Sequence, residues 1–71
     1  MSENSYKILT YLKSHNGATA LEVSEATNIQ KRLVDSYFSA AIANKDLGYR
    51  DTTATPARLF LNEKGMQFTQ E

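Results

Sequence analysis

Residues 19–38 read TALEVSEATNIQKRLVDSYF, and this stretch carries the signals of two consecutive helices joined by a turn. Thr19 and Glu22 stand three positions apart at its start, which is the spacing of a capping box at a helix N-terminus. A helix of about two turns is therefore predicted over residues 20–27. A helix this short is unstable alone and has to pack on its neighbours. The residues predicted to face the core are Leu21, Val23 and Ala26.

A longer helix is predicted over residues 30–45, after a turn centred on Asn28. Asn tolerates the left-handed backbone of a tight turn better than other non-glycine residues do. Asp35 lies at the edge of the outward face of this helix, where it is expected to pair with Arg32 or Lys31 about one turn earlier. The core residues are predicted to be Ile29, Val34 and Phe38. Small or polar side chains occupy the opposite side: Arg32, Ser36, Ser39 and Ala43.

The flanking sequence completes a small α+β domain. Residues 5–15 carry an apolar stripe at helical spacing, and this first helix is predicted to end at Asn16-Gly17. Two short strands are predicted over residues 47–61, because Tyr, Thr, Phe and Leu flank a loop that contains Pro. A turn or short helix capped by Asn62 follows. We therefore expect one domain over residues 1–71, with three helices followed by a two-stranded β-hairpin.

Size and composition point to binding rather than catalysis. The chain has 71 residues, no net charge at pH 7 and no Cys, which leaves little material for a deep pocket and excludes disulfides and Cys-based zinc sites. His15 is the only His, and it has no partner at metal-ligand spacing. We expect no enzymatic activity, no metal and no cofactor. Because the N-terminus lacks a signal-peptide pattern and no long apolar run exists, we also expect a cytoplasmic protein without a membrane partner.

The order of these elements, together with residues 19–38, resembles the winged helix-turn-helix family. In that pattern small Ala26 lets the two helices approach, and Asn28 stands where many relatives have Gly. The tail LFLNEKG, residues 59–65, is similar to the Leu-Thr-Glu-Lys-Gly segment that closes the wing in many bacterial winged-helix regulators. The resemblance covers most of the chain and is greatest for small stand-alone bacterial or phage transcription regulators, including the short fimbrial-operon type.

The resemblance implies sequence-specific binding of double-stranded DNA and regulation of transcription. The helix over residues 30–45 would enter the major groove, where Arg32 and Ser36 would meet base edges and Lys31 would meet a phosphate. The wing would lie on the DNA backbone. Winged helices that bind left-handed nucleic acid carry Asn and Tyr where this chain has Val34 and Phe38, which argues against that class. The expected interface residues are Gln30, Lys31, Arg32, Asp35, Ser36, Ser39, Arg50, Thr53 and Arg58.

The charge distribution supports DNA binding only modestly. Residues 30–58 contain five Lys or Arg and three Asp, a net of +2, while the rest of the chain has a net of −2. A single copy would therefore neutralise few phosphates and bind weakly at physiological salt. We expect a homodimer that doubles the contacts across two half-sites.

Two other functions fit the same sequence. Zero net charge, Asp35 and an outward Phe60 favour a winged helix that binds another protein, as an anti-repressor, an adaptor or a subunit of a larger complex. An accessory factor that acts on DNA architecture is the other alternative. The aromatic residues Tyr6, Tyr11 and Phe68 either complete the core or, with the first helix, form a surface for a homodimer or protein partner.

Overall fold

The computed structural model describes residues 1–69. Its first element is helix α1 (Glu3–Ser14). The hydroxyl of Ser2 caps it by accepting from the amide of Ser5, so the helix begins two residues earlier than expected. Its buried stripe contains Ile8, Leu9 and Leu12. The chain then turns at Gly17, whose φ of +91° is freely available only to glycine.

Strand β1 (Ala18–Thr19) leads directly into helix α2 (Ala20–Thr27), which has the expected bounds. The capping box is confirmed: the amide of Glu22 donates to Thr19 Oγ1 at 3.2 Å, and the amide of Thr19 donates to Glu22 Oε1 at 3.0 Å. Helix α2 ends at Asn28, which has φ 60° and ψ 30°. This is the left-handed turn that the sequence predicts at Asn28.

The prediction that Leu21, Val23 and Ala26 of α2 face the core is partly wrong. Ala20 and Val23 are buried, whereas the side chain of Leu21 is 53% exposed and Ala26 is also exposed. Residues three apart share a helix face, so burying Ala20 with Val23 turns Leu21 about 100° away from the core. The outward position of Leu21 places it beside the next helix and the sheet.

The prediction of one regular helix over residues 30–45 is also wrong. Helix α3 (Lys31–Tyr37) continues into a π-helical segment, η1 (Phe38–Ala43). The amide of Asn44, which follows η1, donates to the carbonyl of Ser39, five residues back, at 3.1 Å. This wider turn accompanies complete burial of both Phe38 and Ile42. The expected core residues Ile29, Val34 and Phe38 are all buried.

The sheet has three antiparallel strands rather than the two expected. Strand β2 (Gly48–Asp51) pairs with β3 (Arg58–Leu61), and β1 pairs with the other edge of β3, in the order β1-β3-β2. Ala18 lies opposite Leu59, and Arg50 lies opposite Leu59 on the other side. Two residues are too few for β1 to show an alternating pattern, so the sequence gives no sign of it.

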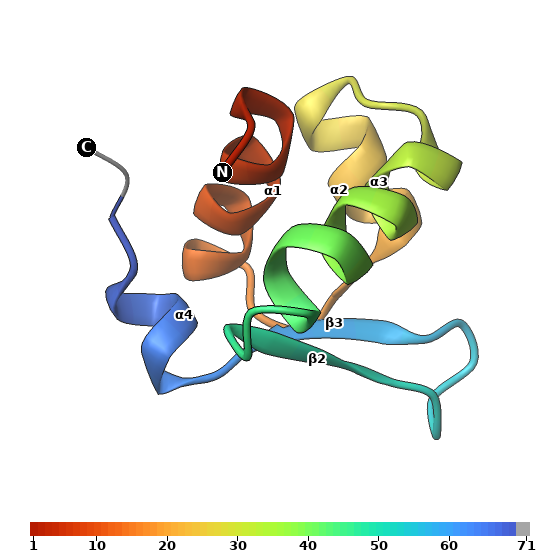
Figure 1. The fold of residues 1–71 in the computed structure, drawn as a ribbon. Helices are drawn as coiled ribbons and strands as arrows, with labels where there is room; N and C mark the ends of the chain where they lie inside the picture. Colours follow the sequence, from red (N-terminus) through yellow and green to blue (C-terminus); the bar gives the residue numbers. More distant parts are fainter. Residues whose placement is uncertain (70–71) are drawn as a thin grey trace.

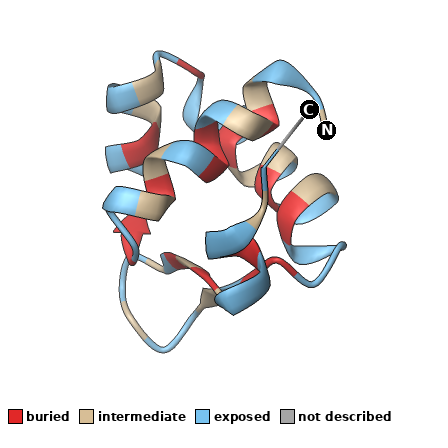
Figure 2. Ribbon diagram, turned by 90° about the vertical axis from the view of Figure 1, so that its left-hand side faces the viewer, coloured by how far each residue is buried: buried red, intermediate tan, exposed pale blue. Residues whose placement is uncertain are grey.

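Helices α1, α2 and α3 lie on one face of the sheet, and the loop between β2 and β3 projects beyond them (Figure 1). The buried residues gather between these two layers (Figure 2). Leu59 and Leu61 face the helices, as the alternation in this strand predicts. Tyr6, Tyr11 and Phe68 are partly buried against the same core, and the rings of Tyr6 and Phe68 meet edge to face at 6.3 Å.

Helix α4 (Glu63–Gln67) begins at the expected cap, where the side-chain oxygen of Asn62 accepts from the amide of Gly65 at 2.9 Å. Gly65 lowers the helix propensity of this segment, yet the packing explains its presence. A Cβ atom at this position would lie 2.0 Å from the carbonyl oxygen of Leu47. Glycine is therefore needed for α4 to approach the start of β2 closely.

Replacing Gly65 with Ala tests this contact. Helix propensity alone predicts that Ala stabilises α4 by about 1 kcal/mol. The backbone clash predicts the opposite, a decrease of roughly 1–3 kcal/mol in the free energy of unfolding. Urea denaturation followed by circular dichroism measures the difference, with Gln67→Ala on the exposed side of α4 as the control. An increase in stability for Gly65→Ala would contradict the close approach.

Candidate nucleic-acid interface

The exposed face of α3 brings together most of the residues expected at a DNA interface. Lys31, Arg32, Ser36 and Ser39 are exposed, and Asp35 is half-buried between them and the sheet. Gln30 precedes the helix, and its side-chain oxygen accepts from Arg32 Nε at 3.3 Å. This face has short Ser side chains at its centre and two cations at the first turn of the helix.

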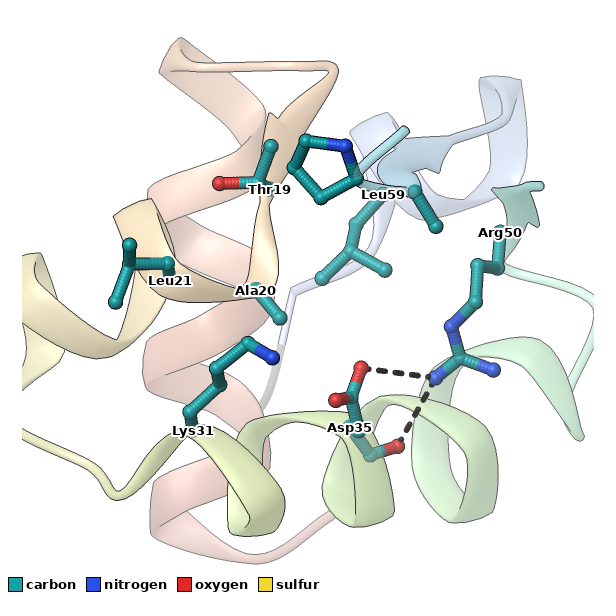
Figure 3. Close-up of a pocket in the computed structure, with 9 residues that line it drawn as sticks. Thr19, Ala20, Leu21, Lys31, Asp35, Arg50 and Leu59 are labelled. Carbon is teal, nitrogen blue, oxygen red and sulfur yellow. Dashed lines mark hydrogen bonds and ion pairs between the residues drawn. The ribbon is translucent and has the colours of Figure 1, made fainter. Parts of the chain in front are cut away.

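Arg50 of β2 joins this face by binding to α3. Its Nη2 donates to Asp35 Oδ1 and to the Asp35 carbonyl, each at 3.3 Å (Figure 3). The same nitrogen donates to Ser39 Oγ at 3.1 Å. The guanidinium carbon also lies 5.7 Å from the centre of the Phe38 ring. The guanidinium of Arg50 is thus held by four groups of the α3–η1 segment: the carboxylate and carbonyl of Asp35, the ring of Phe38 and the hydroxyl of Ser39.

The partner expected for Asp35 was wrong. Asp35 pairs with Arg50 and not with Arg32 or Lys31. Arg50 lies on the side of β2 that faces the helices, because its register partner Leu59 is a core residue. A cation before an acid along a helix is also the less favourable order for a pair within one helix. The long Arg side chain therefore offers Asp35 a better contact from the neighbouring strand.

A cleft of about 230 Å³ lies where the start of α2, helix α3 and the sheet meet. Its polar side is formed by Lys31, Asp35 and Arg50, as Figure 3 shows. Its other side is formed by Thr19, Ala20, Leu21, Pro56, Ala57 and Leu59. The outward turn of Leu21 thus contributes to a cleft that the sequence pattern does not reveal.

Two of the expected interface residues lie away from the α3 face. Arg58 Nη1 donates to the carbonyl of Gly17 at 3.0 Å, and its side chain lines a separate hollow that also contains His15 and Glu22. Thr53 lies in the loop between the strands, where its amide and hydroxyl both donate to Asp51 Oδ1. These contacts separate Arg58 from Arg50, although the sequence assigns both to the wing.

Hydrogen bonding lowers the pKa of two carboxyl groups below their ordinary values. The side chain and amide of Thr53 stabilise the charged form of Asp51 and lower the pKa of that carboxyl. The amide of Thr19, followed by its side chain, lowers the pKa of Glu22 in the same way. Both carboxylates support local structure, one in the hairpin loop and the other at the helix cap.

The face of the sheet turned away from the helices carries an aromatic pair. The rings of Tyr49 and Phe60 are stacked, with their centres 5.3 Å apart. Phe60 is only partly exposed, whereas Tyr49 is 54% exposed. The expected outward position of Phe60 is correct, but the more accessible ring is Tyr49, which the sequence does not single out.

Within residues 1–69, no helix is long and apolar enough to cross a membrane. The same described residues contain no cluster of three or more His, Asp or Glu side chains suited to a metal ion.

Comparison of the chain with protein-family models, with curated proteins and with solved structures gives no match.

Replacing Thr53 with Ala tests the contacts of the hairpin loop. The substitution removes the hydroxyl donor but keeps the amide, so the pKa of Asp51 is expected to rise toward its ordinary value. In the wild type, the stability that the Asp51 carboxylate adds to the folded state is fully present above the ordinary pKa of Asp. It is lost as the pH falls through the lowered pKa. NMR titration of the Asp51 carboxyl carbon measures the change. Thr52→Ala is the control, and an equal shift in both variants would contradict the assignment to Thr53.

Proposed function

We propose that this chain is a winged helix-turn-helix domain that binds duplex DNA in a sequence-specific manner and regulates transcription. The observation that carries the proposal is the exposed polar face of α3, which presents Lys31 and Arg32 and is fastened to strand β2 through Arg50. Helix α3 would enter the major groove, and the β2–β3 hairpin would lie on the adjacent backbone.

The arrangement of elements is compatible with this proposal. Helices α2 and α3 are joined by a short turn at Asn28, and β2 and β3 follow as an antiparallel pair whose loop projects past the helices (Figure 1). The strand β1 between α1 and α2 completes the sheet. These features support the resemblance noted for residues 19–38.

The chemistry of the α3 face suits a groove. Small Ser36 and Ser39 let the helix backbone approach base edges, while exposed Arg32 can donate two hydrogen bonds to one guanine. Lys31 is suited to a phosphate. Arg50 shares its charge with Asp35, so the cations of this face that have no carboxylate partner are Lys31 and Arg32, among the residues the structure describes. One copy would therefore neutralise few phosphates, and we retain the homodimer as the form expected to bind tightly.

The aromatic pair supports a second candidate function, a protein-interaction module. Tyr49 and Phe60 are register partners one step along from Arg50 and Leu59, so strand alternation turns them away from the helices. Helices α1, α2 and α3 all lie on the other face of the sheet (Figure 1). Aromatic side chains are enriched in protein interfaces. In that case a copurifying protein would be lost with Tyr49→Ala or Phe60→Ala and retained with Arg32→Ala.

Titration of a mixed-sequence duplex into isotope-labelled protein at low salt separates the two functions. The DNA proposal predicts amide shifts in residues 30–39 and around β2, which disappear as the salt concentration rises. Absence of any shift at low salt would rule out the proposed DNA interface. Shifts confined to the side of the sheet with Tyr49 would also contradict the placement of α3 in the groove.

Substitutions in α3 provide the residue-level prediction. Arg32→Ala is expected to weaken binding and to relax sequence preference, because a contact with a base edge is lost. Lys31→Ala is expected to weaken binding evenly across sequences and to lower the salt slope by about one. Fluorescence anisotropy over a range of salt concentrations measures both effects.

Lys7→Ala is the matched control for these variants, because Lys7 lies in α1 and pairs with Glu3. Its affinity should equal that of the wild type. If Arg32→Ala also binds like the wild type, Arg32 does not belong to the interface.

A further inference from the structure

Arg50 differs from an ordinary phosphate-binding arginine in how it is held. One nitrogen, Nη2, donates to the carboxylate and carbonyl of Asp35 and to the hydroxyl of Ser39. The other terminal nitrogen points away from Asp35 (Figure 3). The side chain remains 32% exposed. Nη2 is therefore anchored. Both edges of a guanidinium that can bind bidentately include Nη2, so the free Nη1 is left to donate single hydrogen bonds.

The charge of the pair argues for a neutral acceptor as the ligand of those donors. Asp35 is 44% exposed in its side chain and its carboxylate lies 3.3 Å from Nη2. A phosphate that approached Arg50 would also meet this negative charge at close range, so much of the Coulomb attraction would be cancelled. The O6 and N7 atoms of guanine carry no formal charge, and either of them can accept a hydrogen bond from the free Nη1.

The location of the pair is consistent with base contact. Ser39 is exposed and Asp35 is half-buried at the edge of α3 nearest the sheet, and Arg50 reaches both from β2. Positions 32, 36 and 39 are spaced four and three residues apart, which places them on one side of a helix. Arg50 reaches that side through its bond to Ser39. Its attachment also reduces the number of side-chain conformations that binding has to restrict.

We propose that Arg50 is a specificity-determining residue that reads a guanine in the major groove, with Asp35 as its positioning residue. This inference rests on the proposed DNA-binding function and extends it, because the sequence alone assigns Arg50 to the DNA backbone. Asp35 acts through Arg50: it orients the guanidinium and discourages a phosphate from taking the place of the base.

Selection of binding sites from a randomised duplex library tests the proposal with the wild type, Arg50→Lys and Asp35→Asn. The wild type should enrich a motif that contains a guanine absent from the motif enriched by Arg50→Lys, because Lys keeps the charge but its single nitrogen cannot hold Asp35 and Ser39 while a second nitrogen donates to a base. Replacing that guanine in the selected site should weaken wild-type binding by about tenfold or more and Arg50→Lys binding much less.

Asp35→Asn separates positioning from a purely structural role. It removes the negative charge, so binding to unrelated duplexes should become tighter while preference for the same guanine falls. Lys45→Arg, at an exposed position beyond η1, is the control and should select the wild-type motif. Circular dichroism melting verifies that each variant is folded, and Arg50→Gln replaces Arg50→Lys if the latter unfolds.

The outcomes distinguish this inference from the function on which it rests. Enrichment of the same motif by the wild type and Arg50→Lys would overturn the role of Arg50 and leave DNA binding in place. Failure of the wild type to enrich any motif would overturn the sequence-specific function and this inference together. An Asp35→Asn variant with unchanged guanine preference would overturn the positioning role of Asp35.

Discussion

Pairing of β3 with strands on both of its edges is the constraint on which the rest of this structure depends. Leu59 of β3 lies opposite Ala18 on one side and opposite Arg50 on the other. The side chain of Leu59 is fully buried. Thr19 belongs to β1 and at the same time caps α2. The position of β3 therefore sets where α2 begins, and the fixed length of α2 and the turn at Asn28 then set the position of α3.

The same pairing determines which charges meet. Side chains alternate between the two faces of a strand, so Arg50 faces α3. Asp51 and its register partner Arg58 come one residue along and face the other side of the sheet. Arg50 consequently binds Asp35, and Arg58 binds the carbonyl of Gly17 in a different hollow. Residues 30–58 carry a net charge of +2 in the sequence. In the structure their cations do not form one patch, because Arg50 lies against α3 and Arg58 lies near Gly17.

Local signals account for the parts of the fold that the sequence predicts well. The capping box at Thr19, the left-handed turn at Asn28 and the cap at Asn62 each depend on residues within a few positions, and all three form. Two of the errors involve contacts between residues distant in the chain. Strand β1 exists only because β3 is beside it, and the partner of Asp35 depends on a register that no local pattern specifies. Most of the candidate interface was predictable because it lies on one helix face, whereas the cleft beside Leu21 depends on three elements meeting.

Zero net charge is compatible with DNA recognition if affinity and specificity come from different residues. Phosphate contacts provide most of the salt-dependent attraction, and base contacts provide discrimination. Lys31 and Arg32 supply positive charge at the start of α3, while the Asp35–Arg50 pair adds no net charge to the surface yet keeps directed donors. A domain built this way would bind all duplexes weakly as a single copy. Its useful affinity would come from two copies on correctly spaced half-sites, because each copy then contributes a few phosphates and a fixed set of donors. The weak nonspecific attraction would in turn leave fewer copies held on unrelated DNA.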